Sequence, residues 1–165
     1  MPHFKNMIQK IELKRARIGV IGLGYVGLPI VLRFAEEGYD IIGFDTDAQK
    51  VKLLNKGASY IKHIPSKMIS DIVRNKKPSF IATTDMSMLA KTDAIIICVP
   101  TPLTDKREPD LSYVENTAKE ISKYLKPGQI VSLESTTYPG TTEEILLPLF
   151  RNNKMKVGRD FFLVF

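Results

Sequence analysis

The sequence of 165 residues predicts an α/β fold, with a doubly wound parallel sheet as a single domain. Short β-branched runs alternate with longer segments of helical periodicity along the chain. Residues 94–99 form a continuous apolar run, as expected of a central parallel strand covered on both faces. A glycine-rich turn follows the first strand and leads into a helix. These three observations together are typical of an open α/β sheet.

The first half of the chain is expected to supply three strands and four helices. The strands are predicted at residues 17–21, 40–44 and 80–82. The helices are predicted at residues 25–37 and 47–55, from about Ser66, and as a short helix at 84–90. Thr46 or Asp47 can cap the start of the second helix, and Gly38 and Gly57 follow the first two helices.

The second half continues the same alternation. Strands are predicted at residues 94–99, 129–133 and 161–165, and helices at 111–125 and 141–150. Residues 17–165 are expected to form the domain, and residues 1–16 an amino-terminal extension that is a short leading helix or an ordered tail. The chain stops inside an apolar strand without a polar tail, as expected of a single-domain fragment of a longer protein.

Several classes of site and location are not expected. The only cysteine, Cys98, is predicted to be a small buried hydrophobe inside a strand, so no disulfide is possible. His3 and His63 have no companion at ligand spacing, which argues against a metal site. The net charge is +6, but Lys and Arg are spread along the chain, so nucleic-acid binding is not expected. No membrane-length apolar run or secretory signal is present, and a cytoplasmic location is expected.

The turn after the first strand carries the pattern G-x-G-x-x-G in Gly22, Gly24 and Gly27. Between a strand and a helix, this pattern is the fingerprint of a dinucleotide-binding loop. Gly22 would permit a tight turn, Gly24 the approach of a pyrophosphate, and Gly27 close packing of helix on strand. The free amides at the start of the helix would then bind the phosphates.

Asp45 follows the second strand at the distance that this fingerprint requires. An Asp there can accept hydrogen bonds from both ribose hydroxyls of an adenosine and would repel a 2′-phosphate, so NAD is favoured over NADP. The alternative is that Asp45 only caps the next helix and the glycines make an ordinary turn. The agreement of loop, acid and strand order favours a Rossmann-type domain that binds NAD.

Several blocks of this sequence resemble the UDP-glucose, UDP-N-acetylglucosamine and UDP-N-acetylmannosamine 6-dehydrogenases, over residues 17–165. The blocks are residues 22–29, 44–47, 50–57, 98–102 and 134–142. Residues 101–104 and 107–112 look most like the branch that acts on N-acetylated UDP-hexosamines. The UDP-glucose branch usually has a different loop there.

The resemblance implies a role in the cofactor site for fourteen residues: Gly22, Leu23, Gly24, Tyr25, Val26, Gly27, Asp45, Lys50, Val99, Pro100, Thr101, Ser135, Thr136 and Thr137. Lys50 would join Asp45 near the adenosine ribose, unless it is a solvated helix Lys. Thr136 would help to orient a water or the reacting oxygen, a supporting catalytic role, unless its hydroxyl only serves the turn. Glu134 is interpreted as a strand-end residue and not as a base.

The reaction implied by the resemblance is oxidation of the sugar C6 hydroxyl to a carboxylate with two NAD⁺. Its catalytic Cys, Glu, Lys and Asn, a central helix and a UDP-sugar-binding domain would all follow Phe165, and the full-length protein would be a homo-oligomer. The present chain is therefore expected to bind NAD but not to oxidise sugars alone. The alternatives are a UDP-glucose 6-dehydrogenase, a dehydrogenase of the hydroxyisobutyrate or 6-phosphogluconate type, and a non-catalytic nucleotide-sensing domain.

Overall fold

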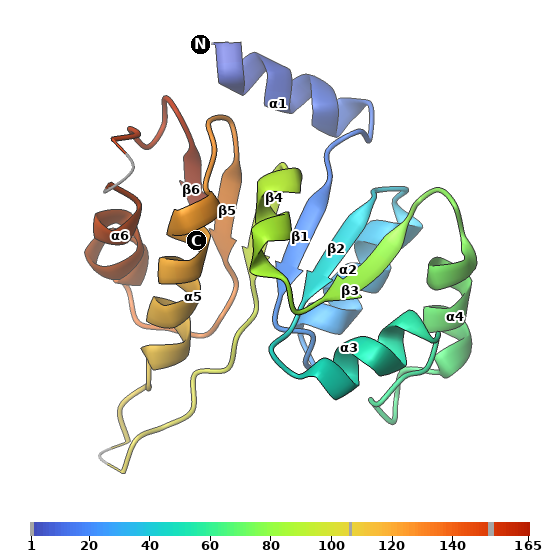
Figure 1. Cartoon of the computed structure of the whole chain (residues 1–165). Helices are drawn as coiled ribbons and strands as arrows, with labels where there is room; N and C mark the ends of the chain where they lie inside the picture. The colour runs from blue at the N-terminus through green and yellow to red at the C-terminus, as the bar shows by residue number, and fades with distance from the viewer. Residues whose placement is uncertain (1, 106, 152–153) are drawn as a thin grey trace.

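The computed structural model describes residues 2–105, 107–151 and 154–165. Within these residues, six strands form one parallel sheet in the order β3-β2-β1-β4-β5-β6 (Figure 1). The strands are β1 (Ile18–Ile21), β2 (Ile41–Phe44), β3 (Phe80–Thr83), β4 (Ala94–Ile97), β5 (Ile130–Leu133) and β6 (Phe162–Val164). The strand order reverses between β1 and β4, and ligands of open α/β sheets bind beside such a reversal. The predicted doubly wound fold is confirmed.

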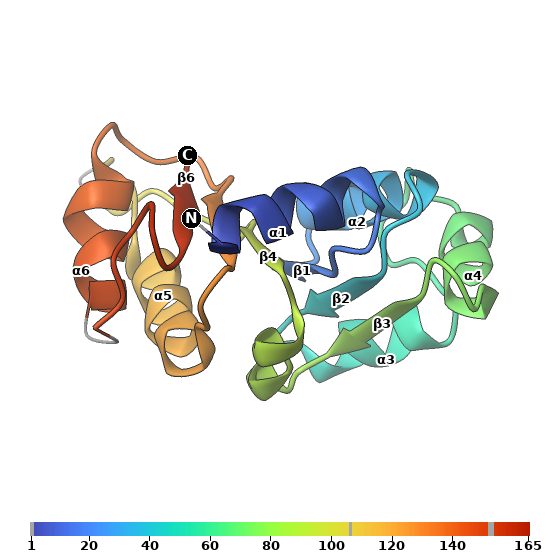
Figure 2. The same cartoon turned by 90° about the horizontal axis from the view of Figure 1, so that it is seen from above.

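Helices cover both faces of the sheet, with α2 and α5 on opposite sides (Figure 2). Their bounds are α2 (Gly27–Glu36), α3 (Ala48–Asn55), α4 (Ser66–Arg74), the 3₁₀ helix η1 (Met86–Lys91), α5 (Ser112–Tyr124) and α6 (Leu147–Arg151). One core cluster lies under α2 and includes Val20, Leu28 and Ile96. The other lies under α5 and α6 and includes Ile95 and Ile121. Successive β4 residues therefore serve opposite faces, which explains the continuous apolar run.

The predicted elements all occur, and the ends that were predicted shift by at most two residues. The helix predicted at 141–150 begins instead with a wide π-type turn, η2 (Thr142–Leu146), before α6. Pro148 in α6 has no amide to donate to the carbonyl of Glu144, four residues earlier. A regular α-helical bond is therefore impossible there, which favours an irregular turn.

The strand predicted at 94–99 ends at Ile97, and the prediction that Cys98 lies inside it is wrong. Its neighbour β1 ends at Ile21, and Gly22 turns the chain away with a φ of 90°. Because the Cys98 amide still donates to the Ile21 carbonyl (2.8 Å), Cys98 stays at the end of the sheet. It is half-buried against the core beneath α2, less enclosed than predicted.

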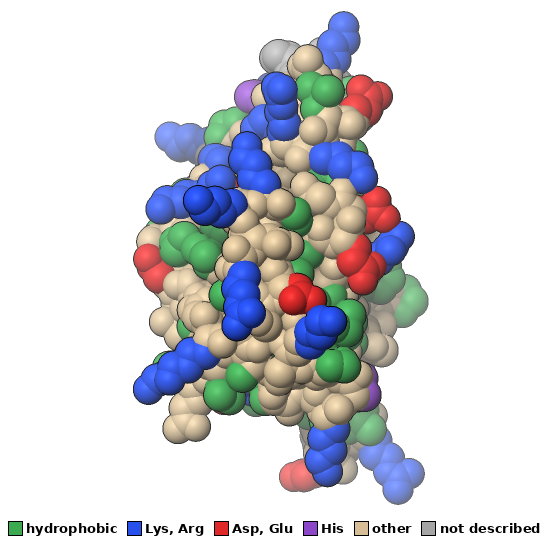
Figure 3. Space-filling model, turned by 90° about the vertical axis from the view of Figure 1, so that its right-hand side faces the viewer, with side chains coloured by type: hydrophobic (Ala, Val, Ile, Leu, Met, Phe, Trp, Pro, Cys, Tyr) green, Lys and Arg blue, Asp and Glu red, His purple; other side chains and the backbone are tan. Residues whose placement is uncertain are grey.

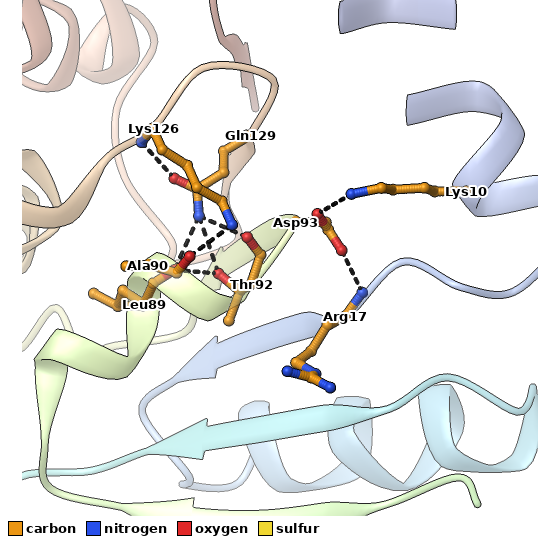
Figure 4. Close-up of polar contacts among 8 residues, drawn as sticks. All are labelled: Lys10, Arg17, Leu89, Ala90, Thr92, Asp93, Lys126 and Gln129. Atoms are coloured by element: carbon orange, nitrogen blue, oxygen red, sulfur yellow. Dashed lines mark hydrogen bonds and ion pairs between the residues drawn. The ribbon is translucent and has the colours of Figure 1, made fainter. Parts of the chain in front are cut away.

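The amino-terminal extension forms a helix, α1 (Pro2–Glu12), which lies across the amino ends of the strands (Figures 1 and 2). Its Lys10 Nζ forms an ion pair with Asp93 Oδ1 at 2.7 Å, and Asp93 Oδ2 accepts the Arg17 amide at 2.9 Å (Figure 4). The Tyr39 hydroxyl donates to the Ile11 carbonyl at 3.0 Å. Of the two structures expected for this segment, the structure shows the helix.

A buried amide side chain, that of Gln129, forms hydrogen bonds at the same amino ends of the strands. Gln129 Nε2 donates to the carbonyls of Leu89 (2.9 Å) and Thr92 (2.8 Å), and its Oε1 accepts the Lys126 amide at 2.8 Å (Figure 4). Gln129 is fully buried, and these bonds satisfy both ends of its amide. They tie the end of η1 to the start of β5.

Charged side chains are distributed over the surface. On the face in Figure 3, Lys and Arg occur from top to bottom, with acidic and hydrophobic side chains among them. Among the described residues, no helix has the length and apolar character needed to cross a membrane. Within the same residues, no group of three or more His, Cys, Asp and Glu side chains could hold a metal ion.

Candidate functional site

The glycine loop, residues 22–26, joins the carboxyl end of β1 to α2. A Cβ on Gly22 would lie 2.5 Å from the carbonyl oxygen of Cys98, and one on Gly27 would lie 1.8 Å from the carbonyl oxygen of Gly22. These two glycines therefore allow the loop to fold against the end of β4 and α2 to begin directly above it. Gly24 is different, because a Cβ there would meet nothing within 4 Å. The backbone at Gly24 borders open space.

The amides of the glycine loop are available to a ligand. Within the described part of the chain, those of Gly24, Tyr25 and Val26 have no hydrogen-bond partner, while the carbonyls of Gly24 and Val26 accept bonds from α2. Tyr25 and Val26 are exposed, Tyr25 by 74%. Unpaired amides at a helix amino terminus carry partial positive charge and form an anion-binding site.

Asp45, one residue after β2, holds this loop from the side. Its Oδ2 accepts the Leu23 amide at 3.0 Å, and its Oδ1 accepts the Asp47 amide at 3.0 Å. The cap of α3 is Asp47 instead, whose Oδ1 accepts the amides of Gln49 (2.8 Å) and Lys50 (3.2 Å). The alternative in which Asp45 only caps the next helix is therefore wrong. A carboxylate has about four acceptor positions, so Asp45 can still accept bonds from a ligand.

Lys50 and Tyr60 extend the Asp45 side of the site. Lys50 is partly buried, and its ammonium group lies 5.7 Å from the centroid of the Tyr60 ring, so it is not a fully solvated helix Lys. The Tyr60 hydroxyl donates to the Leu23 carbonyl. Sequence reasoning missed Tyr60, which lies in an irregular stretch without a motif. The only local signal is a polar-tipped aromatic residue beside the apolar Ile61.

The loops after β4 and β5 form the other side of the site and are joined by side-chain hydroxyls. Thr101 Oγ1 donates to the Thr136 carbonyl at 2.8 Å, and Ser135 Oγ donates to the Val99 carbonyl at 2.7 Å. Pro100 is exposed between these two contacts. The hydroxyl protons of Thr101 and Ser135 are thus engaged within the protein, although their oxygens can still accept.

The two threonines after Ser135 differ in environment. Thr136 is exposed, so its side chain can reach a ligand. The Oγ1 of Thr137 is buried and has no hydrogen-bond partner in the described residues. Buried hydroxyls are rarely left unpaired, and an orphan at a ligand site indicates a partner outside the chain. Glu134 directly follows β5, as predicted, and accepts a bond from Ser132 Oγ at 2.6 Å.

Cys98 lies beneath the glycine loop, at the centre of the site. Burial, and next the negative charge of Glu134, raise the pKa of its thiol to about 11. The thiol is therefore protonated at neutral pH, the opposite of an activated nucleophile. This agrees with the interpretation that Cys98 is not a catalytic thiolate.

A cavity of about 260 Å³ lies at the opposite edge of the sheet and is not part of this site. Its lining includes His3 and Lys10 from α1, with Asp93, Lys126 and Gln129. Lys10 is paired with Asp93, and Lys126 Nζ donates to the Ala90 carbonyl at 2.6 Å. Ligands of open α/β sheets bind at the carboxyl ends of the strands, where the glycine loop lies, and not at this edge.

The four predicted segments therefore lie along one edge of adjacent strands. The glycine loop follows β1, Asp45 follows β2, and residues 99–101 and 135–137 follow β4 and β5. Direct contacts join Leu23 to Asp45 and Thr101 to Thr136. Such an edge, with free amides, a carboxylate and hydroxyls, can bind an extended dinucleotide.

Comparison with known proteins gives matches over nearly the whole chain. Residues 16–165 match the model of the UDP-glucose/GDP-mannose dehydrogenase family, NAD binding domain. The UDP-N-acetyl-D-mannosamine dehydrogenase of Pyrococcus horikoshii is 35% identical over 148 residues, which cover 89% of this chain and 35% of that protein. The UDP-N-acetyl-D-glucosamine 6-dehydrogenase of Pseudomonas aeruginosa is 34% identical over 152 residues, 91% of this chain and 34% of that one.

A solved structure of the same family has a similar fold. A ternary complex of GDP-mannose dehydrogenase from Pseudomonas aeruginosa superposes with a TM-score of 0.83 at 29% identity, over 89% of this chain and 35% of that chain. The present chain thus spans about a third of the length of these relatives. The chain therefore belongs to the UDP-glucose/GDP-mannose dehydrogenase family, of which it forms the NAD-binding domain.

Proposed function

We propose that this chain is the cofactor-binding part of a UDP-N-acetylhexosamine 6-dehydrogenase. The observation that carries the proposal is the bond between Asp45 and the glycine loop at the carboxyl edge of the sheet, which leaves free amides beside a carboxylate. The two relatives described above are named as dehydrogenases of UDP-N-acetyl-D-mannosamine and UDP-N-acetyl-D-glucosamine, which supports an N-acetylated UDP-hexosamine as the substrate.

In this proposal, different residues bind different parts of the dinucleotide. The amides of Gly24, Tyr25 and Val26 would bind the pyrophosphate. Asp45, with Lys50 beside it, would accept bonds from the adenosine ribose hydroxyls and repel a 2′-phosphate. The open space at Gly24 supports this fit, because a pyrophosphate needs close approach to the backbone.

The loops after β4 and β5 would hold the nicotinamide half. Val99, Pro100 and Thr101 would pass beneath the cofactor, and Ser135, Thr136 and Thr137 would lie beside the ring. The unpaired Oγ1 of Thr137 supports a polar ligand atom here. Bound NAD supplies a hydride acceptor, and Thr136 would have the supporting role of orienting a water or the reacting oxygen near it.

The complete reaction belongs to a longer protein in this proposal. The sugar C6 hydroxyl would be oxidised to a carboxylate by residues of a further domain, in a cytoplasmic homo-oligomer whose central helix and UDP-sugar-binding domain follow this one. Residues 17–165 would form the cofactor domain, and α1 its extension. The chain alone would bind NAD without oxidising UDP-sugars, because the resemblance places the catalytic residues after Phe165, and Cys98, whose pKa is raised, would not replace the catalytic thiolate.

Calorimetric titration of the chain with NAD⁺ and with NADP⁺ tests the binding. We expect binding of NAD⁺ and much weaker binding of NADP⁺. The chain is then incubated with NAD⁺ and UDP-N-acetylglucosamine, UDP-N-acetylmannosamine or UDP-glucose, and absorbance at the NADH band is followed. Sugar-dependent NADH formation would contradict the proposed inactivity of the isolated chain, and absence of NAD⁺ binding would contradict the assigned site.

A further inference from the structure

The loop of residues 56–65, between α3 and α4, reaches across to the glycine loop and contacts it at two points. The Tyr60 hydroxyl donates to the carbonyl of Leu23, 37 positions away. The ring of His63 stacks on Tyr25 with a centroid distance of 5.7 Å and an interplanar angle of 26°. This loop is therefore part of the wall of the cofactor site, although no sequence motif marks it.

The loop is itself held in a defined conformation. Ile61 and Ile64 are buried in the core beneath α2. Ser59 Oγ accepts the Ile61 amide at 3.1 Å, and the Ser59 amide donates to Ser66 Oγ at 3.0 Å, at the start of α4. Tyr60 thus projects from a segment fixed on both sides, as a residue that orients another group requires.

The side chain, the backbone amide and the backbone carbonyl of Leu23 are all held in place by contacts. Its side chain is fully buried, its amide donates to Asp45, and its carbonyl accepts from Tyr60. The peptide bond between Leu23 and Gly24 is trans, so its C=O and N–H point in opposite directions. Holding the Leu23 carbonyl therefore sets the direction of the Gly24 amide, which has no partner among the described residues and borders open space.

The Tyr60 hydroxyl is suited to remain a donor. Burial, and next the charges of Asp45 and Asp47, raise its pKa, so the hydroxyl keeps its proton at neutral pH. A hydrogen bond to a peptide carbonyl also polarises the N–H of the same peptide group and makes it a better donor. Tyr60 therefore both directs and strengthens the Gly24 amide.

We propose that Tyr60 is a positioning residue of the cofactor site, whose hydroxyl holds the Leu23–Gly24 peptide so that the Gly24 amide points at the pyrophosphate of NAD. The proposal rests on the pyrophosphate site assigned to the glycine loop under the proposed function. Tyr60 acts through the backbone of the loop and not through the reacting atoms.

The test is the Tyr60→Phe variant, which removes only the hydroxyl. We expect its affinity for NAD⁺ and for ADP to fall about three- to tenfold, the effect of one lost hydrogen bond. The affinity for adenosine, which has no phosphate and is titrated by NMR, should stay unchanged. The ¹H–¹⁵N resonance of Gly24 in the ligand-free protein should move, because its amide shares a peptide group with the released carbonyl.

Tyr39→Phe is the matched control, because the Tyr39 hydroxyl also donates to a backbone carbonyl, that of Ile11, away from the glycine loop. It should leave the affinity for NAD⁺ and the Gly24 resonance unchanged. Equal loss of affinity in both variants, an unmoved Gly24 resonance, or unchanged affinity of Tyr60→Phe would overturn this proposal alone. Absence of NAD⁺ binding by the unchanged protein would overturn the proposed function and this proposal together.

Discussion

The amide of Leu23 and the carboxylate of Asp45 form a hydrogen bond of 3.0 Å between residues 22 positions apart. This bond joins the loop after β1 to the end of β2. The acid therefore supports the loop, and in the proposed function it also binds the adenosine ribose. If Asp45 has both roles, a substitution there changes both the loop and the affinity for NAD⁺, so each variant needs a control that separates the two effects.

Asp45→Asn keeps one acceptor oxygen, which can still accept the Leu23 amide, but it loses the bond from the Asp47 amide and the negative charge. We expect weaker binding of NAD⁺ and a preference for NAD⁺ over NADP⁺ that narrows by about tenfold, because the repulsion of a 2′-phosphate is lost. Calorimetric titration with both cofactors measures the change. Asp47→Ala is the control: loss of the α3 cap should cost about 1 kcal/mol of stability and leave the preference intact. An unchanged preference in Asp45→Asn would mean that Asp45 does not face the ribose.

Gly24 and Gly27 should respond oppositely to alanine. Gly24→Ala should fold with a melting temperature close to that of the unchanged protein, because its Cβ meets nothing, but should lose NAD⁺ affinity because the methyl group occupies the phosphate position. Gly27→Ala should lose several kcal/mol of stability, since its Cβ would lie 1.8 Å from a backbone oxygen. Thermal unfolding and titration of both variants check this. A Gly24→Ala protein with full affinity would exclude the assigned pyrophosphate position.

Cys98 should react slowly with iodoacetamide until strongly alkaline pH, because burial and Glu134 raise its pKa from the usual 9.0 to about 11. The protonated thiol is favoured by folding, so its contribution to stability is complete below pH 9.0 and is lost as the pH rises to about 11. Glu134→Gln should lower the alkylation pKa. Alkylation rates measured against pH test both statements, and an inflection at the usual thiol pKa in the folded protein would refute them.

Gln129→Leu should destabilise the fold without changing the cofactor site. The substitution leaves the carbonyl of Thr92 and the amide of Lys126 without their partner, whereas the Leu89 carbonyl keeps its bonds from the amide and hydroxyl of Thr92. We expect a loss of about 2–4 kcal/mol in the free energy of unfolding. Urea denaturation measures it, with Gln9→Leu on the exposed face of α1 as the control that should change little. Equal stabilities of the two variants would show that the buried bonds contribute no net stability.

The parts of this protein that the sequence predicts are those determined by local pattern. The spacing of Gly22, Gly24 and Gly27 between a β-branched run and an amphipathic segment specifies a strand, a turn and a helix. The alternation of such units leaves few topologies, because parallel crossovers have one hand. The doubly wound parallel sheet, which the structure confirms, follows from these rules.

The parts that were missed depend on contacts between distant residues. Tyr60 lies in an irregular loop, and its bond to Leu23 exists only because this loop contacts the glycine loop after β1. Cys98 continues the apolar run of β4 and therefore looks like a strand residue. On the adjacent strand β1, however, the chain turns away at Gly22, so β4 ends at Ile97 and Cys98 follows it. No local pattern reports where a partner strand ends, so these positions require the assembled sheet.

The placement of α1 has a practical consequence for handling the protein. The helix lies across the amino ends of the strands, and the glycine loop lies at their carboxyl ends (Figure 1). A bead, an electrode or a fluorescent reporter attached ahead of α1 is thus separated from the glycine loop, the proposed dinucleotide site, by the length of the strands. Immobilisation through the amino terminus leaves diffusion of small molecules to the opposite edge unobstructed, which makes that end the natural anchor for a cofactor sensor.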